Sequence, residues 1–137
     1  MTFININNIE LNNSQKSIIL FNLDNRELIS INNMSRAVGI KNIIKVNSKN
    51  ANSIIEDIID NKISDDNEEL ISQKAIIFNN IAPKQMNFIL DTLKKIKANN
   101  IYKATTTPTS LKWSIKTLIQ NLVEERESLK NKNSIHK

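Results

Sequence analysis

The chain has 137 residues and a formal net charge of +5, with no Cys, a single Gly and a single His. This length predicts one domain, and the lack of Cys excludes disulfides, zinc–thiolate sites and Cys nucleophiles. A single Gly excludes phosphate-binding loops of the Walker type and dinucleotide-binding fingerprints, because both need several glycines. The first residues lack the pattern of a signal peptide and no apolar run is long enough to span a membrane, so we expect a cytoplasmic protein.

The only His, His136, lies next to the last residue. Ser–His–Asp and His–metal constellations are therefore not expected, and we predict no catalytic activity, no cofactor and no metal. The single Gly has a second consequence, since left-handed backbone positions are normally filled by Gly and otherwise by Asn. We expect several of the many Asn residues to take that role.

The first half of the chain has the pattern strand–helix–strand–helix. Residues 16–22 (KSIILFN) form a short apolar run rich in β-branched residues, which is typical of a buried strand. Asp24 and Glu27 have the spacing of a capping box, which predicts a helix to about Val38, followed by Gly39 at its end. Residues 43–46 predict a second strand.

A second helix is predicted over residues 51–60, because Ile54, Ile55, Ile58 and Ile59 form one apolar stripe. Residues 1–15, which alternate loosely in hydropathy, are treated as an N-terminal extension that could add an edge strand. Between the halves lies an acidic linker, residues 61–73. Its carboxylates, Asp65, Asp66, Glu68 and Glu69, lack the spacing of a calcium loop, so a solvated loop is predicted.

The pattern then repeats. Residues 74–79 (KAIIFN) restate the first strand, and Pro83 suits the first turn of a helix that runs to about Ala98. Asn99 is expected at the left-handed stop that Gly39 provides in the first half. A strand over 101–105 and a last helix follow, which predicts two related βαβα halves, 16–62 and 74–122, about 58 residues apart.

These elements predict an α/β fold in which the two related βαβα halves form a small, largely parallel sheet covered by helices. A split antiparallel arrangement of the ferredoxin-like kind is the alternative. The single domain is expected to cover residues 16–127. Residues 128–137 lose the apolar period and are expected to form a frayed helix end or a flexible tail.

The last helix is predicted to begin with Thr107 as its N-cap and Pro108 as its first residue. Its apolar stripe then consists of Leu111, Ile115, Leu118, Ile119 and Leu122. At about 100° per residue, Trp113 falls on the opposite, polar side. Phe88 is similarly off the stripe of the preceding helix.

Because Trp is a preferred interface anchor, we predict a non-enzymatic protein-binding or regulatory module, or a self-associating one. Its partner-binding residues are Trp113, Lys112, Lys116 and Phe88. The alternative for Trp113 is that its own chain covers it.

Two other hypotheses stay open. The start of the last helix could bind an anion or a nucleotide through Thr106, Thr107 and Thr109, with Lys112 as the charge partner. Weak RNA binding through Lys112, Lys116 and the basic tail ranks last, because the sequence lacks the aromatic platform of RNA-binding sheets.

The segment Thr107–Trp113 (TPTSLKW), preceded by a strand and followed by an apolar helix ending in Glu-Glu, resembles the C-terminal signature of a family of small bacterial proteins, domain of unknown function 3783. That signature reads approximately Thr-Pro-Thr-Asn, two variable positions, then Trp, so Ser110 departs from it. The strong part of the resemblance covers about residues 74–126. It implies a place in the family and no particular activity.

Overall fold

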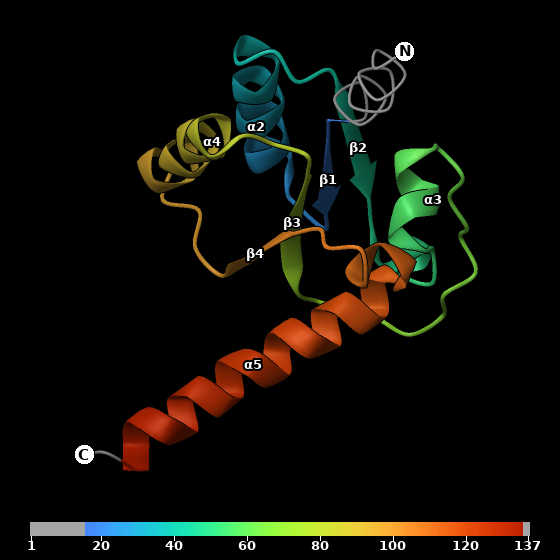
Figure 1. The fold of residues 1–137 in the computed structure, drawn as a ribbon, viewed down its shortest axis with the longest axis vertical. Coiled ribbons are helices and arrows are strands. Elements are labelled where there is room, and N and C mark those ends of the chain that lie inside the picture. Colours follow the sequence, from blue (N-terminus) through green and yellow to red (C-terminus); the bar gives the residue numbers. More distant parts are fainter. Residues whose placement is uncertain (1–15, 136–137) are drawn as a thin grey trace, which may run out of the picture.

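The computed structural model describes residues 16–135, and the side chains of residues 131–135 are left out of the description. Four strands alternate with four α-helices (Figure 1). The elements are β1 (Ser17–Phe21), α2 (Asn25–Ala37), β2 (Asn42–Val46), α3 (Ile55–Ile59), β3 (Lys74–Asn79), α4 (Pro83–Lys95), β4 (Ile101–Thr105) and α5 (Ile115–Ile135). Short 3-10 helices, η1 (Ser48–Asn50) and η2 (Ser110–Lys112), precede α3 and α5. The predicted N-terminal extension, residues 1–15, lies outside the described residues.

The strands form one sheet in the order β2-β1-β3-β4. The outer pairs, β1 with β2 and β3 with β4, run parallel, and the central pair β1–β3 runs antiparallel. The expected α/β fold with a mostly parallel sheet is confirmed. The split antiparallel alternative is wrong, because only the central pair is antiparallel. The relatedness of the two halves stays a prediction.

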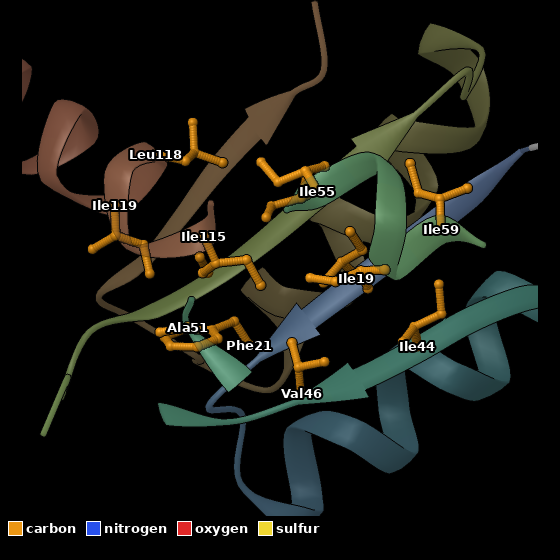
Figure 2. Packing of buried hydrophobic residues seen from close by; sticks show 13 residues of the cluster. Ile19, Phe21, Ile44, Val46, Ala51, Ile55, Ile59, Ile115, Leu118 and Ile119 are labelled. Carbon is orange, nitrogen blue, oxygen red and sulfur yellow. The ribbon is translucent and has the colours of Figure 1, made fainter. Parts of the chain in front are cut away.

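The central strands are buried on both faces, as near-continuous apolar strands should be. Side chains of a strand alternate between faces, and β1 accordingly feeds two cores. Ile18 and Leu20 pack on the side of α2 and α4, and Ile19 and Phe21 pack on the side of α3 and α5 (Figure 2). The molecule therefore has three layers, with the sheet between two helical layers.

The predicted capping box of α2 is present. The Asp24 carboxylate accepts a hydrogen bond from the Glu27 N–H, and the Glu27 side chain accepts one from the Asp24 N–H. The first of these bonds, which favours the charged carboxylate, lowers the pKa of Asp24. The Glu27 side chain is buried and pairs with the Lys74 ammonium of β3 at 2.9 Å. This hydrogen bond and the charge attraction raise the pKa of Lys74.

Asparagine does replace Gly at left-handed backbone positions, as predicted. Of the described residues other than Gly with positive φ, four are Asn, and they lie after β1, after α3, after β3 and before β4: Asn22, Asn61, Asn80 and Asn100. The predicted stop at Asn99 is wrong, because the left-handed residue after α4 is Lys97, with φ of 56°. The helix ends at Lys95, so the position after its C-cap falls on Lys97.

The second helix is shorter than the predicted 51–60, since α3 covers only Ile55–Ile59. The residues before it are held in other structures. Asn47 and Asn50 form a reciprocal pair of hydrogen bonds that starts η1. Ile54 is extended and forms an isolated antiparallel bridge with Ser114. The apolar stripe is otherwise as expected, because Ile55, Ile58 and Ile59 are all buried.

The acidic linker has no helix or strand, in agreement with the prediction of a loop. Its backbone is nevertheless anchored. Buried Asn67 donates through Nδ2 to the carbonyls of Ser48 and Glu69, and Ser53 and Ser64 are joined by hydrogen bonds. The loop thus lies against the η1 region.

The last helix runs to Ile135, well beyond the predicted domain end at 127, and its second half projects past the sheet (Figure 1). None of the helices in residues 16–135 combines the length and apolarity needed to cross a membrane.

Replacing Lys74 with Met should lower the free energy of unfolding by about 1–2 kcal/mol at neutral pH, because buried Glu27 loses its cation. The raised pKa means that this stability is fully present below the unfolded-state value of 10.5 and is lost as pH rises through the folded-state pKa. Urea unfolding at pH 7 and above pH 10.5 measures both effects. The difference from wild type should shrink at the higher pH. Exposed Lys84→Met is the control, and an equal effect of the control would contradict this role for Lys74.

Replacing Lys97 with Gly should raise the free energy of unfolding by about 0.5–1 kcal/mol, because Gly adopts positive φ without steric strain. Thermal or urea unfolding measures the gain. Lys95 is the last residue of α4, and Lys95→Gly should instead lower the free energy of unfolding by a similar amount. A loss of stability in both variants would show that the φ at Lys97 is not a source of strain.

Candidate binding groove

The chain after β4 does not enter the helix at Thr107. Thr107 and Ser110 instead close a turn with reciprocal hydrogen bonds. The Thr107 N–H donates to Ser110 Oγ at 2.9 Å, and the Ser110 N–H donates to Thr107 Oγ1 at 3.0 Å. The 3-10 helix η2 follows, and α5 begins only at Ile115. The prediction that Thr107 is the N-cap and Pro108 the first residue of the last helix is therefore wrong.

A backbone pairing with the region before α3 explains this later start. The Ile55 N–H donates to the Trp113 carbonyl, and the Ile115 N–H donates to the Ser53 carbonyl. These bonds hold Trp113 in an extended conformation, with ψ of 154°, which is incompatible with a helix. The Ser114 hydroxyl then accepts a hydrogen bond from the Thr117 N–H at 3.1 Å, as an N-cap residue does.

Trp113 is partly buried and packs against the core between the sheet and α3/α5. Its position on a polar helix face was wrongly predicted, because it precedes the helix. The rest of its surface lines a groove of about 590 Å³ between β4 and α5. The residues lining this Trp113 groove are Ala104, Thr105, Thr107, Ser110, Trp113, Leu118, Asn121, Leu122, Glu124 and Glu125.

The two lysines of the predicted surface have acidic partners. Lys112 Nζ lies 2.8 Å from Glu56 Oε1, and Lys116 Nζ lies 3.5 Å from Glu69 Oε1. The hydrogen bond to Glu56, reinforced by charge attraction, raises the pKa of Lys112. Lys112 belongs to η2 and Lys116 to α5, and each reaches a different carboxylate.

The predicted anion site has lost most of its donors. The Thr106 N–H donates to the Phe78 carbonyl, and the Thr106 hydroxyl donates to Asn79 Oδ1 at 2.7 Å. The Thr107 N–H is used in the turn, and Thr109 is exposed without a side-chain capping bond. Anion binding at Thr106, Thr107 and Thr109 stays a prediction. The free N–H groups of a helix N-terminus, on which it depended, are not present at these residues.

A cavity of about 390 Å³ does lie beside Thr106 and Thr107, at the carboxyl ends of β3 and β4. It is lined by Glu56, Ile59, Asp60, Asn79, Asn80, Thr106, Thr107, Pro108 and Leu111. The two carboxylates oppose an anionic ligand, while Lys112 is already paired with one of them. The electrostatics of this cavity therefore disfavour the phosphate or nucleotide that the sequence suggested.

Phe88 lies apart from the other predicted partner-binding residues. It is 47% exposed on α4, and α4 packs on the opposite face of the sheet from α5. A single surface that includes both Phe88 and Trp113 is therefore not formed. Within residues 16–135 no group of His, Asp and Glu side chains is placed to hold a metal ion. His136 and the last part of the basic tail lie outside the described residues.

The sequence contained no direct signal for the groove itself. Its walls come from β4, from α5 and from the segment between them, which are not adjacent to one another in a local sequence pattern. A further cavity, of about 330 Å³, also had no signal in the sequence. It lies at the other end of β4 and is lined by Asn87, Leu90, Asp91, Leu93, Lys94, Ala98, Asn99, Asn100, Ile101, Lys103 and Arg126.

Replacing Thr107 with Val should lower the free energy of unfolding by about 1 kcal/mol, because the Ser110 N–H loses its acceptor. Thr109→Val should change it by less than about 0.5 kcal/mol, since that side chain is exposed. Thermal unfolding with and without millimolar phosphate checks both points. We expect phosphate to leave the midpoint unchanged; a phosphate-dependent rise that Thr107→Val abolishes would support the anion site instead.

Searches among curated proteins and among solved structures found nothing similar to the chain. A family model does match, from the start of β3 to beyond the middle of α5, and this segment contains every residue that lines the Trp113 groove. The resemblance noted in the sequence is confirmed over residues 74–129, which match the family described as Domain of unknown function (DUF3783).

Proposed function

We propose that this protein is a non-enzymatic binding module that recognises another protein through the Trp113 groove. The observation that supports the proposal is the position of Trp113, which is anchored in the core on one side and lines an open groove on the other. Large aromatic side chains that are held rigidly and remain partly accessible are the usual energetic centres of protein interfaces. Because the backbone around Trp113 is bonded to Ser53 and Ile55, the ring needs little further ordering on binding.

The groove also has the composition of a recognition site. Leu118 and Leu122 supply apolar area beside Trp113, while Asn121, Glu124 and Glu125 supply polar groups. An apolar centre with a polar rim is the usual anatomy of a protein–protein interface. Lys112 and Lys116 serve this surface indirectly, since their ion pairs tie the segments on both sides of Trp113 to α3 and to the acidic linker.

We further propose that the chain consists of two related βαβα halves. Equivalent features recur 58 positions apart: the left-handed residues Asn22 and Asn80, and the left-handed residues Gly39 and Lys97. The two helices that cover one face of the sheet, α2 and α4, have 13 residues each, and they begin 58 positions apart.

Reciprocal contacts between the halves support the same relation. Lys74 donates to Glu27 at 2.9 Å, and Lys16 donates to Gln85 at 3.5 Å. The two Lys residues are 58 positions apart and so are the two acceptors, so each half donates to the other from an equivalent position. The groove departs from this symmetry, because none of its residues belongs to the first half. We propose that the second half carries the binding role and that the first half completes the sheet.

The proposal is tested by affinity capture with the immobilised protein from the native lysate, followed by quantitative mass spectrometry. Trp113→Ala should reduce the captured partner by at least about tenfold, because truncating an interface anchor costs about 2 kcal/mol or more. Phe88→Ala is the matched control, since it removes an aromatic that is exposed on the opposite helical layer.

Trp113→Phe separates binding from folding, because it keeps an aromatic against the core. It should retain the wild-type fold by circular dichroism and still weaken capture. Equal capture by wild type, Trp113→Phe and Trp113→Ala would refute the role of the groove.

A further inference from the structure

We infer that the partner binds as an extended segment that adds to the open edge of β4 as a fifth strand, with an acidic side chain facing Lys103 and a basic side chain facing Glu124 and Glu125. This inference rests on the proposed protein-binding function and specifies how the groove is used and what chemistry fits it.

The first observation is that β4 ends the sheet. Among the described residues it pairs with β3 alone. The Thr106 N–H donates to the Phe78 carbonyl of β3, and backbone groups alternate in direction along a strand. The N–H and C=O groups of Lys103 and Thr105 therefore point away from β3. An edge of this kind is a ready template for main-chain hydrogen bonds with an added strand.

The second observation is that a cavity lies on each face of this edge. The Trp113 groove lies on the α5 side and includes Ala104 and Thr105 of β4. The 330 Å³ cavity lies beside α4 and includes Ile101 and Lys103 of β4. Successive side chains of an added strand point to opposite faces of the sheet, so one chain can fill both cavities. A helix or a globular surface placed on one face would reach only one of them.

The third observation is that the two cavities differ in charge. Glu124 and Glu125 are the charged residues that line the Trp113 groove. The cavity on the α4 side has Lys94, Lys103 and Arg126 against the single carboxylate of Asp91. Arg126 reaches this cavity from α5, and its guanidinium lies 4.0 Å from the centre of the Tyr102 ring of β4. Complementarity therefore requires basic residues on one face of the partner strand and acidic residues on the other.

These charges also exclude a second copy of this chain as the favoured occupant. Lys103 lies in the middle of the five-residue strand β4. A twofold antiparallel pairing of two β4 strands about their centres would place Lys103 opposite its symmetry mate. Like charges directly opposite one another destabilise such a pair, and edge lysines are a common barrier to self-association. A foreign strand with a carboxylate at that position turns the same Lys into a favourable contact.

The test uses two capped synthetic peptides of seven residues. The first, Lys-Glu-Val-Glu-Val-Thr-Lys, places Lys and Val on one face of an extended strand and Glu on the other. The second replaces both Glu residues with Lys. Binding to the full-length protein is followed by Trp113 fluorescence and by amide hydrogen exchange at Lys103 and Thr105. We expect the first peptide to shift the fluorescence and to protect both amides.

Charge reversal provides the decisive comparison. The Lys103→Glu variant should bind the first peptide about tenfold more weakly than wild type does. It should bind the second peptide more tightly than wild type does. Lys45→Glu, an exposed Lys on the opposite edge strand β2, is the matched control and should leave both affinities unchanged. The same two variants are applied to capture of the partner from lysate, where only Lys103→Glu should reduce recovery.

The outcomes separate this inference from the proposed function. Failure of the first peptide to bind at millimolar concentration, or binding without protection of Lys103 and Thr105, overturns strand addition. If capture still depends on Trp113 in that case, the protein-binding proposal stands. If neither the peptide nor any captured protein depends on Trp113, both proposals fall.

Discussion

The antiparallel pairing of β1 with β3 is the constraint on which the rest of this structure depends. It joins the two parallel pairs into one sheet and makes two strands that are buried on both faces the centre of the molecule. Both faces then need helices, since apolar side chains alternate along each strand. The same pairing places β2 and β4 at the edges, and β4 is the edge that α5 leaves partly open.

A second long-range pairing determines where the candidate site lies. The backbone of Trp113–Ile115 is hydrogen-bonded to that of Ser53–Ile55, close to the ends of the two halves. This contact shortens α3 and α5 at their N-terminal ends relative to the prediction, so that α3 begins at Ile55 and α5 at Ile115. As a result Trp113 is held against the core while still facing a groove, a combination that a position inside a regular helix would not provide.

Electrostatics adds direction to this site. Lys112 and Lys116, which are prominent in the sequence, are neutralised by Glu56 and Glu69. The charged residues that remain beside the open strand are Glu124 and Glu125 in the Trp113 groove, and Lys94, Lys103, Arg126 and Asp91 in the cavity beside α4. The chain therefore presents opposite charges on the two faces of one strand edge. This arrangement is the basis on which we propose a foreign extended segment as the partner rather than a phosphate, a nucleotide or a second copy.

The sequence by itself determined the features that depend on neighbouring residues. The four predicted strands are present, the Asp24–Glu27 spacing became a capping box, and Asn took left-handed positions in a chain with one Gly. Only the tertiary structure decided the antiparallel centre of the sheet, the start of α5 and the partners of Lys112 and Lys116. Each of these depends on contacts between residues distant in the chain, which outweigh local preference; Thr107 and Pro108 are good helix-starting residues that the pairing of Trp113 with Ile55 overrides.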